Sequence, residues 1–381
     1  VAAEPIDLTQ AEALGGPLVF LAVWLATATE RPSTRRLLAA GAVVGVCAAV
    51  KLTLAPLAAA GLAVALLTAR RGTRGREAVR TVGWSVLGFV AVVSAVGAHL
   101  AATGALGEAL DTWFRFAPRT TSTAPPPVSR LVRSAVRFGV MYAPVALLAV
   151  AGATRLRRRS WAAGPPRLLL AMALWLVLTA PMVLVQHWWP YLFQIAVVPL
   201  GVLAASGTDV SAEWARHATA RRRSLAGAGL AVAVVIALVA AAPKWASLVE
   251  HRFGVAAADR RALQEDLDPA YARAAAFAEA TRGRPGDLLV LGDPVVHQVS
   301  GRRLGVPTNG WSPEQLDAAH WARLGRELAD ERPAYLVVDE ASRELLDERA
   351  PEVAALIEAD WCEFGGVGGD RWYAARDLGV C

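Results

Sequence analysis

Long apolar blocks are the feature that most restricts how this chain can fold. A helix needs about 20 apolar residues to cross the hydrocarbon core of a bilayer, within a range of roughly 17–25. Hydrophobic residues make up 55% of the 381 residues and charged residues only 19%, whereas a soluble domain carries about 25% charged residues. The chain is therefore predicted to be a polytopic membrane protein. Its candidate spans are residues 14–29, 37–69, 82–102, 138–154, 168–185, 191–206 and 225–242.

The block at residues 37–69 is too long for one crossing. As a single helix it would run roughly 50 Å, against a hydrocarbon core of about 30 Å. Lys51 interrupts it, and the short loops on both sides of it are rich in arginine. Because arginine-rich loops stay in the cytoplasm, the block must cross an even number of times. We therefore predict a helical hairpin with Lys51 near its outer tip.

The other arginine-rich loops, near residues 155–159 and 216–223, fit the same orientation. This predicts about eight crossings in the plasma membrane, with both ends of the chain outside. Residues 104–137 form a long outer loop with five arginines, against the charge rule. Either an anionic partner binds there, or long loops obey the rule only weakly.

Residues 244–381 change in composition and resemble an ordinary soluble domain. Residues 287–292 (DLLVLG) and 335–338 (YLVV) are predicted buried strands, and 372–375 a late edge strand. Ser312 followed by Pro313 is typical of a helix start, for a helix to about residue 330. The expected fold is mostly α: a transmembrane helix bundle (1–243), then a small extracytoplasmic α/β domain (244–381).

The sequence also limits the chemistry. It contains no GxxxxGK[ST] loop, no GxGxxG after a strand, no HExxH and no CxxC pair, so no metal site is specified, although a divalent metal is not excluded. The net charge of +6 comes from arginines in short loops, which indicates a lipid bilayer and no nucleic acid as partner. An outer location would allow Cys362 and Cys381 to form a disulfide, and two unpaired thiols are the alternative.

The predicted topology gathers polar residues at the outer face. Lys51 stands in an apolar block, where a lysine costs about 2.5–3.5 kcal/mol, so it is either functional or extended toward the headgroups. His187 is either a general base or sugar contact, or simply solvated, whereas Trp188 and Trp189 are typical of the aromatic belt. The candidate substrate-binding residues are Glu4, Asp7, Gln10, Glu12, Lys51, Arg115, His187 and Tyr191.

Several segments together resemble the GT-C superfamily of lipid-linked-sugar glycosyltransferases, which includes protein mannosyltransferases and aminoarabinose-transferase-like enzymes. EPIDLTQAEAL (4–14) resembles their second outer loop, and AAGAVVGVCAAVKLTLAPLA (39–58) resembles their helix pair with glycines, lysine and proline. PYLFQIAVVPLGVLAASG (190–207) resembles a turn that follows an aromatic pair. GDLLVLGDPVVHQVSGRR (286–303) and RPAYLVVD (332–339) resemble the outer α/β domain of bacterial members.

This resemblance implies transfer of a sugar from a polyprenyl-phosphate donor to an extracytoplasmic glycan, lipid or protein acceptor. It implies that Glu4, Asp7, Gln10 and Glu12 contact substrate. It also implies that Lys51 and Tyr191 face the lipid phosphate. Many relatives have His-Tyr where this chain has Pro190-Tyr191.

The resemblance also bears on the catalytic carboxylate. The family's catalytic Asp lies in the first outer loop, and this chain, whose first residue is Val1, is expected to begin after that loop. The principal catalytic Asp is therefore expected upstream of Val1, in a longer protein. No residue of the present chain is assigned to that role.

Two other kinds of function fit a multi-span chain. A transporter or lipid flippase with an outer sensing domain usually places charges or broken helices near the bilayer midplane. Here the polar residues gather at one face, which favours chemistry at the interface. A non-catalytic membrane scaffold is the third alternative. The sequence identifies neither the sugar nor the acceptor.

Overall fold

A computed structural model describes residues 11–68, 74–116, 128–158, 164–184, 190–253, 270–311 and 313–380. The chain divides into two compact units, residues 1–248 and 249–381. Each unit is described by itself.

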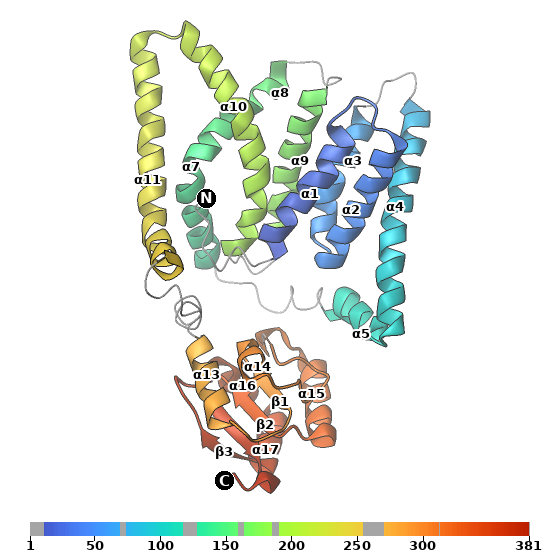
Figure 1. Cartoon of the computed structure of the whole chain (residues 1–381), viewed down its shortest axis with the longest axis vertical. Helices are drawn as coiled ribbons and strands as arrows, with labels where there is room; N and C mark the ends of the chain where they lie inside the picture. The colour runs from blue at the N-terminus through green and yellow to red at the C-terminus, as the bar shows by residue number, and fades with distance from the viewer. Residues whose placement is uncertain are drawn as a thin grey trace. The chain divides into compact units, whose positions relative to one another are not determined.

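The first unit is a bundle of helices that run alternately in opposite directions (Figure 1). Five helices of the described part are long and apolar enough to cross a membrane, so the unit has the character of a multi-pass membrane bundle. Residues Leu14–Thr27 and Leu54–Leu67 form shorter apolar helices. The helices are α1 (Ala11–Thr27), α2 (Thr34–Val50), α3 (Leu54–Leu67), α4 (Arg74–Ala102), α5 (Leu106–Asp111), the π-helical turn η2 (Thr112–Phe116), α7 (Val128–Ala153), α8 (Arg155–Arg158), α9 (Gly164–Leu184), the 3-10 segment η3 (Pro190–Ala196), α10 (Val197–His217) and α11 (Ala220–Phe253).

The predicted break in the long apolar block is confirmed at Lys51. Helix α2 ends at Val50, and Lys51 adopts an extended backbone conformation with φ −158° and ψ 117°. Its N–H still donates to the carbonyl of Cys47 at 2.9 Å, which closes the helix, and α3 begins at Leu54. The block is therefore two helices joined by a short turn. The count of about eight crossings stays a prediction.

Glycines bring two pairs of helices into backbone contact. A Cβ on Gly41 of α2 would lie 1.9 Å from the carbonyl oxygen of Ser85 on α4, and one on Gly88 of α4 would lie 2.0 Å from that of Leu38. Helices α7 and α10 repeat the arrangement through Gly152 and Gly207. Small residues that allow such close approach are typical of helix pairs packed in lipid.

Arg167, at the start of α9, ties together the ends of two other helices. Its side chain is buried, and its guanidinium donates to the carbonyls of Glu30 and, at 2.9 Å, of Thr68. These carbonyls follow the C-terminal ends of α1 and α3, where carbonyl groups lack partners within the helix and the helix dipole favours a cation. Arg167 therefore fixes the end of the bundle opposite to Lys51.

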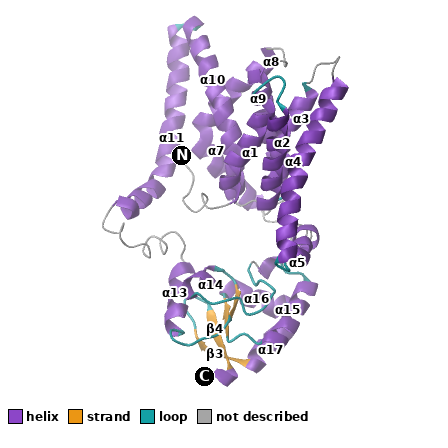
Figure 2. Ribbon diagram, turned by 45° about the vertical axis from the view of Figure 1, so that its right-hand side comes forward, coloured by secondary structure: helices purple, strands orange, loops and turns teal. Residues whose placement is uncertain are grey.

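The second unit is a four-stranded sheet covered by helices (Figure 2). The strand order is β1-β2-β4-β3; β1 and β2 are parallel, and β4 is antiparallel to both β2 and β3. Its elements are α13 (Ala270–Ala280), β1 (Leu288–Leu291), α14 (Val295–Ser300), η5 (Pro313–Gln315), α15 (Ala318–Glu331), β2 (Tyr335–Val338), α16 (Glu340–Arg349), α17 (Pro351–Asp360), β3 (Trp361–Gly365), β4 (Arg371–Ala375) and η6 (Arg376–Leu378).

The structure confirms both predicted buried strands and corrects two details of the tail. The late strand β4 lies inside the sheet between β2 and β3, so it is not an edge strand. Helix α15 begins at Ala318, where the Asp317 side chain accepts from the N–H of His320 at 3.0 Å; Pro313 starts only a 3-10 turn. Cys362 is disulfide-bonded, Cys47 is a buried free thiol, and Cys381 lies outside the described residues.

Candidate functional site

The alternation of helix direction collects several connections at one end of the bundle. The α2–α3 turn, the α4–α5 junction, the start of α7 and the segment η3 all lie at this end, and the arginine-rich connections lie at the other (Figure 1). We call the first the polar end. It contains the described candidates Lys51 and Tyr191, together with η2, which includes Arg115.

The first turns of α1 lie between the two candidate segments. A Cβ on Gly15 would lie 2.5 Å from the side chain of Leu54, which begins α3 directly after the Lys51 turn. A Cβ on Gly16 would lie 3.1 Å from Val198, at the start of α10 directly after η3. The two glycines therefore allow α1 to contact both segments. Glu12 belongs to the same turns of α1, one helical turn before Gly16.

The Lys51 turn presents a cation and a hydroxyl. Lys51 is half-buried, and its carbonyl accepts the N–H of Leu54 at 2.9 Å, which fixes the turn. The Thr53 hydroxyl oxygen is buried and has no hydrogen-bond partner among the described residues. A buried hydroxyl without a partner costs roughly 1–3 kcal/mol. The turn is therefore able to accept a hydrogen-bonding ligand group.

Segment η3 is anchored by apolar residues and presents polar ones. Leu192 and Ile195 are buried in the bundle, while Tyr191 and Gln194 are half-buried. The hydroxyl of Tyr142, on α7, donates to Oε1 of Gln194 at 3.1 Å. The polar face of η3 is thus held in position by α7 as well as by α1.

The structure brings together only part of the predicted set. Glu4, Asp7, Gln10 and His187 lie outside the described residues. The backbones of Glu12 and Arg115 are placed in α1 and η2, but their side chains are not described. Lys51 and Tyr191 lie at the polar end: η3 contacts α1, and α1 approaches Leu54 directly after the Lys51 turn.

The expected position of the principal catalytic Asp, upstream of Val1, stays a prediction. Val1 and the residues that follow it as far as Gln10 lie outside the described part of the chain. The structure therefore assigns no carboxylate to the role of catalytic base, and the geometry of the polar end concerns the binding of a substrate.

Sequence reasoning missed Thr53, Gln194 and Tyr142. Thr53 follows Lys51 by two residues, so its place in the turn could have indicated it. Gln194 is a polar residue inside an apolar segment, which is a similar signal. Tyr142 gave no signal, because a tyrosine in an apolar block is ordinary and its contact with Gln194 depends on how α7 and η3 pack.

Buried charge is scarce in the described part of the bundle. Arg167 is the charged residue among its buried side chains, and it bonds helix carbonyls at the end opposite to Lys51. No group of three or more His, Cys, Asp or Glu side chains among the described residues is arranged to hold a metal ion. The polar chemistry of the described bundle is therefore concentrated at its ends.

The second unit holds a group of carboxylates near the ends of β1 and β2. Burial, together with the nearby charges of Asp339 and Asp293, raises the pKa of Asp370, although Arg273 donates to its Oδ2 at 3.0 Å. Asp339 accepts the N–H of Ser342 at 2.7 Å and so caps α16. Asp293 accepts the N–H of Val295 at 2.9 Å. These contacts give the group a structural role in holding turns and helix starts.

No protein family model, no curated protein and no solved structure matches this chain. The resemblance to GT-C glycosyltransferases therefore rests on the sequence segments alone.

Proposed function

We propose that this chain is part of a membrane glycosyltransferase that moves a sugar from a polyprenyl-phosphate donor to an acceptor outside the membrane. The observation that carries the proposal is that the first turns of α1 approach Leu54, directly after the Lys51 turn, and Val198, directly after η3. An ammonium group, a buried hydroxyl without a partner among the described residues and a half-buried tyrosine then belong to one end of an apolar bundle. A lipid-linked phosphate needs this combination of apolar surface and nearby hydrogen-bond donors.

The reaction would be a displacement at the anomeric carbon of the sugar. The acceptor oxygen forms a bond to this carbon as the bond to the phosphate oxygen breaks, and the phosphate leaves with the bonding electrons. The acceptor proton passes to a carboxylate base, which the resemblance assigns to an outer-loop Asp or Glu. Negative charge grows on the leaving phosphate, so a fixed cation and fixed donors lower the barrier.

Within this reaction we assign Lys51 to the leaving phosphate. The Thr53 hydroxyl is a second donor from the same turn, and Tyr191 approaches from η3. Glu12, one helical turn before Gly16, would contact the sugar or the acceptor. The site would lie at the outer face of the plasma membrane, with the second unit on the same side.

A transporter or flippase is less well supported. Transporters bind their cargo near the bilayer midplane, usually beside charges or broken helices. Among the buried side chains described in the bundle, the charged one, Arg167, bonds the helix ends opposite to Lys51. This arrangement favours chemistry at a membrane surface.

The test is transfer of radiolabelled sugar from polyprenyl-phosphate donors in membranes that contain the natural gene product of this chain. We expect Lys51→Ala to lower transfer by about 10²–10³-fold, the usual effect of removing one donor to a developing negative charge. Lys51→Arg keeps the charge and should retain part of the activity. Leu52→Ala is the matched control, because Leu52 is 50% exposed in the same turn and carries no charge.

Two results would contradict the proposal. One is the absence of transfer from every polyprenyl-phosphate sugar offered to membranes that contain the protein in normal amounts. The other is full activity of Lys51→Ala, which would remove Lys51 from the site.

A further inference from the structure

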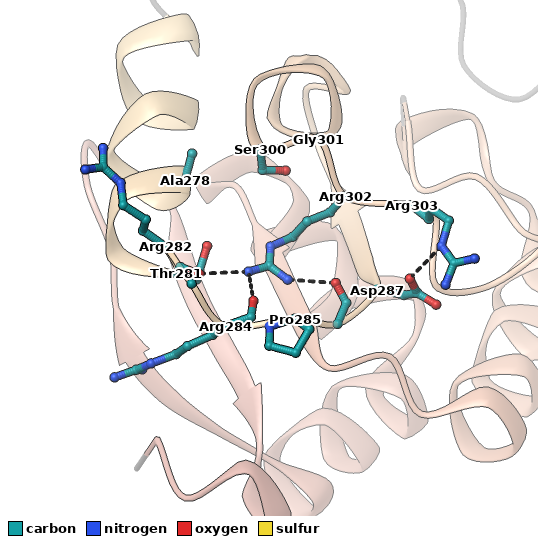
Figure 3. A pocket seen from close by; sticks show the side chains of 12 residues that line it. Ala278, Thr281, Arg282, Arg284, Pro285, Asp287, Ser300, Gly301, Arg302 and Arg303 are labelled. Carbon is teal, nitrogen blue, oxygen red and sulfur yellow. Dashed lines mark hydrogen bonds and ion pairs between the residues drawn. The ribbon is translucent and has the colours of Figure 1, made fainter.

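The second unit contains a shallow cavity of about 600 Å³ that is lined mainly by positive charge (Figure 3). It lies where α13 and α14 end and β1 begins. Asp287 is the acidic residue among those that line it. Its four basic lining residues are Arg282, Arg284, Arg302 and Arg303.

Arg302 forms the fixed centre of this group. Its guanidinium donates to the carbonyl oxygens of Gly286 at 2.7 Å, Thr281 at 3.0 Å and Arg284 at 2.6 Å. It also lies over the ring of Tyr335, 4.3 Å from the ring centroid. The contacts satisfy the carbonyls that follow α13, but carbonyl groups are neutral, so the charge of Arg302 remains.

The other three arginines are not needed to satisfy helix carbonyls. Arg303 pairs with Asp287 at 3.3 Å, but its side chain is 87% exposed, and ion pairs this exposed are weak. Arg282 pairs with Glu279. Arg284 is exposed and has no ion-pair partner within the described ranges. The cavity stays positive after both carboxylates are counted.

We propose that this cavity binds the phosphate of an anionic phospholipid headgroup and so holds the second unit against the membrane surface. Arginine suits phosphate because its planar guanidinium donates two parallel hydrogen bonds to two oxygens. Figure 3 shows Arg284 and Arg303 extending on opposite sides of the fixed Arg302 guanidinium, so a phosphate above Arg302 would lie between two exposed donors.

The chain itself favours a membrane phosphate over a soluble one. Helix α11 contains an apolar window, Ala220–Pro243, that is long enough to span a bilayer, and the second unit begins its described part at Ala270. The connection from Phe253 to Ala270 can extend roughly 60 Å at most. The chain therefore tethers the cavity within reach of headgroups, whose local concentration exceeds that of dissolved phosphate.

The test is native mass spectrometry of the full chain in a neutral detergent, titrated with phosphatidylglycerol, phosphatidylcholine or glycerol phosphate. We expect one phosphatidylglycerol to bind more tightly than phosphatidylcholine. The double variant Arg284→Ala/Arg303→Ala should weaken this binding by roughly 30-fold, about 5-fold for each arginine near a lipid surface. Arg326→Ala is the matched control, because Arg326 is exposed on α15 and does not line the cavity.

Equal phosphatidylglycerol affinity in the wild type and the double variant would overturn the proposal. An equal loss with Arg326→Ala would do the same, since it would show a general effect of net charge. If glycerol phosphate binds as tightly as the lipid, and this binding is lost in the double variant, the claim that the bound phosphate belongs to a membrane lipid is overturned. These outcomes do not depend on sugar transfer, because the cavity and the polar end belong to different units.

Discussion

The packing of α2 against α4 leads to a prediction about Gly88. A Cβ at this position would lie 2.0 Å from the carbonyl oxygen of Leu38 and 2.9 Å from the backbone nitrogen of Ala42. Ordinary contacts between carbon and a carbonyl oxygen are about 3.3–3.6 Å, so the two helices would have to separate by roughly 1.3 Å. Neither atom can move alone, because both belong to helix backbone.

The change in stability caused by Gly88→Ala follows from two opposing effects. Overpacking of this kind costs about 1–3 kcal/mol, while replacing a helical glycine with alanine favours the helix by roughly 0.5–1 kcal/mol. The difference spans about 0–2.5 kcal/mol, and because the clash is with helix backbone, Gly88→Ala should lie in its upper part, at about 1–2 kcal/mol. For a unit of this size that lowers the thermal midpoint by roughly 2–8 °C.

The matched control is Gly83→Ala on the same helix. Gly83 is exposed, and a Cβ there would meet no atom within 4 Å, so the helix preference acts alone and the midpoint should stay or rise. The assay is thermal unfolding of both purified variants in detergent, followed by size-exclusion chromatography. Equal midpoints for the two variants, or a higher one for Gly88→Ala, would refute the close backbone contact of α2 and α4.

Three further predictions concern other contacts. Arg167→Met removes the buried donor to the carbonyls after α1 and α3. Each of these hydrogen bonds to a charged group is worth about 1.5–3 kcal/mol, so the thermal midpoint should fall by more than in Gly88→Ala. An unchanged midpoint would contradict the role of Arg167. Burial lowers the pKa of His297 below 6.5, although the carbonyl of Arg302 partly opposes this. As the pH falls, the unfolded chain therefore binds this proton before the folded chain does, so the second unit should lose stability on acidification. His297→Gln should reduce this loss. The measurement is the thermal midpoint of both proteins at about pH 7.5 and about pH 5.5. If Cys362 pairs with Cys381, maleimide labelling of the denatured chain should modify one thiol before reduction and three after it, and three before reduction would exclude the disulfide.

The sequence predicted a multi-pass helical bundle, because the length of a membrane-spanning helix is set by the hydrophobic thickness of the bilayer; the count of eight crossings stays a prediction. The break at Lys51 was predictable for the same reason, since the block was too long for one crossing. The partners of each helix were not predictable. The contact of α2 with α4, for example, depends on Gly41 and Gly88 facing each other, which no local pattern indicates.

The second unit shows where local patterns stop being sufficient. The strands β1 and β2 are continuous apolar runs, buried at all four positions, so periodicity identified them. Strand β3 was missed because WCEFG is only partly buried and mixed in character. The place of β4 inside the sheet follows from its pairing with β3, a tertiary feature. The cavity formed by α13, α14 and β1 likewise exists only after these segments pack.

In the proposed orientation, the Lys51 turn lies at the outer face of the membrane and the arginine-rich connections lie inside. Single cysteines at Leu52 and Arg31 test it with a membrane-impermeant maleimide. Leu52 is 50% exposed in the Lys51 turn, and the Arg31 side chain is 57% exposed between α1 and α2. The unsubstituted chain, in which Cys47 is buried and Cys362 is disulfide-bonded, gives the background labelling to be subtracted.

We expect Leu52→Cys to be labelled in intact cells, and Arg31→Cys to be labelled only after the membrane is permeabilised. Labelling of Arg31→Cys but not Leu52→Cys in intact cells would place the polar end in the cytoplasm and contradict the account of an outer site for sugar transfer.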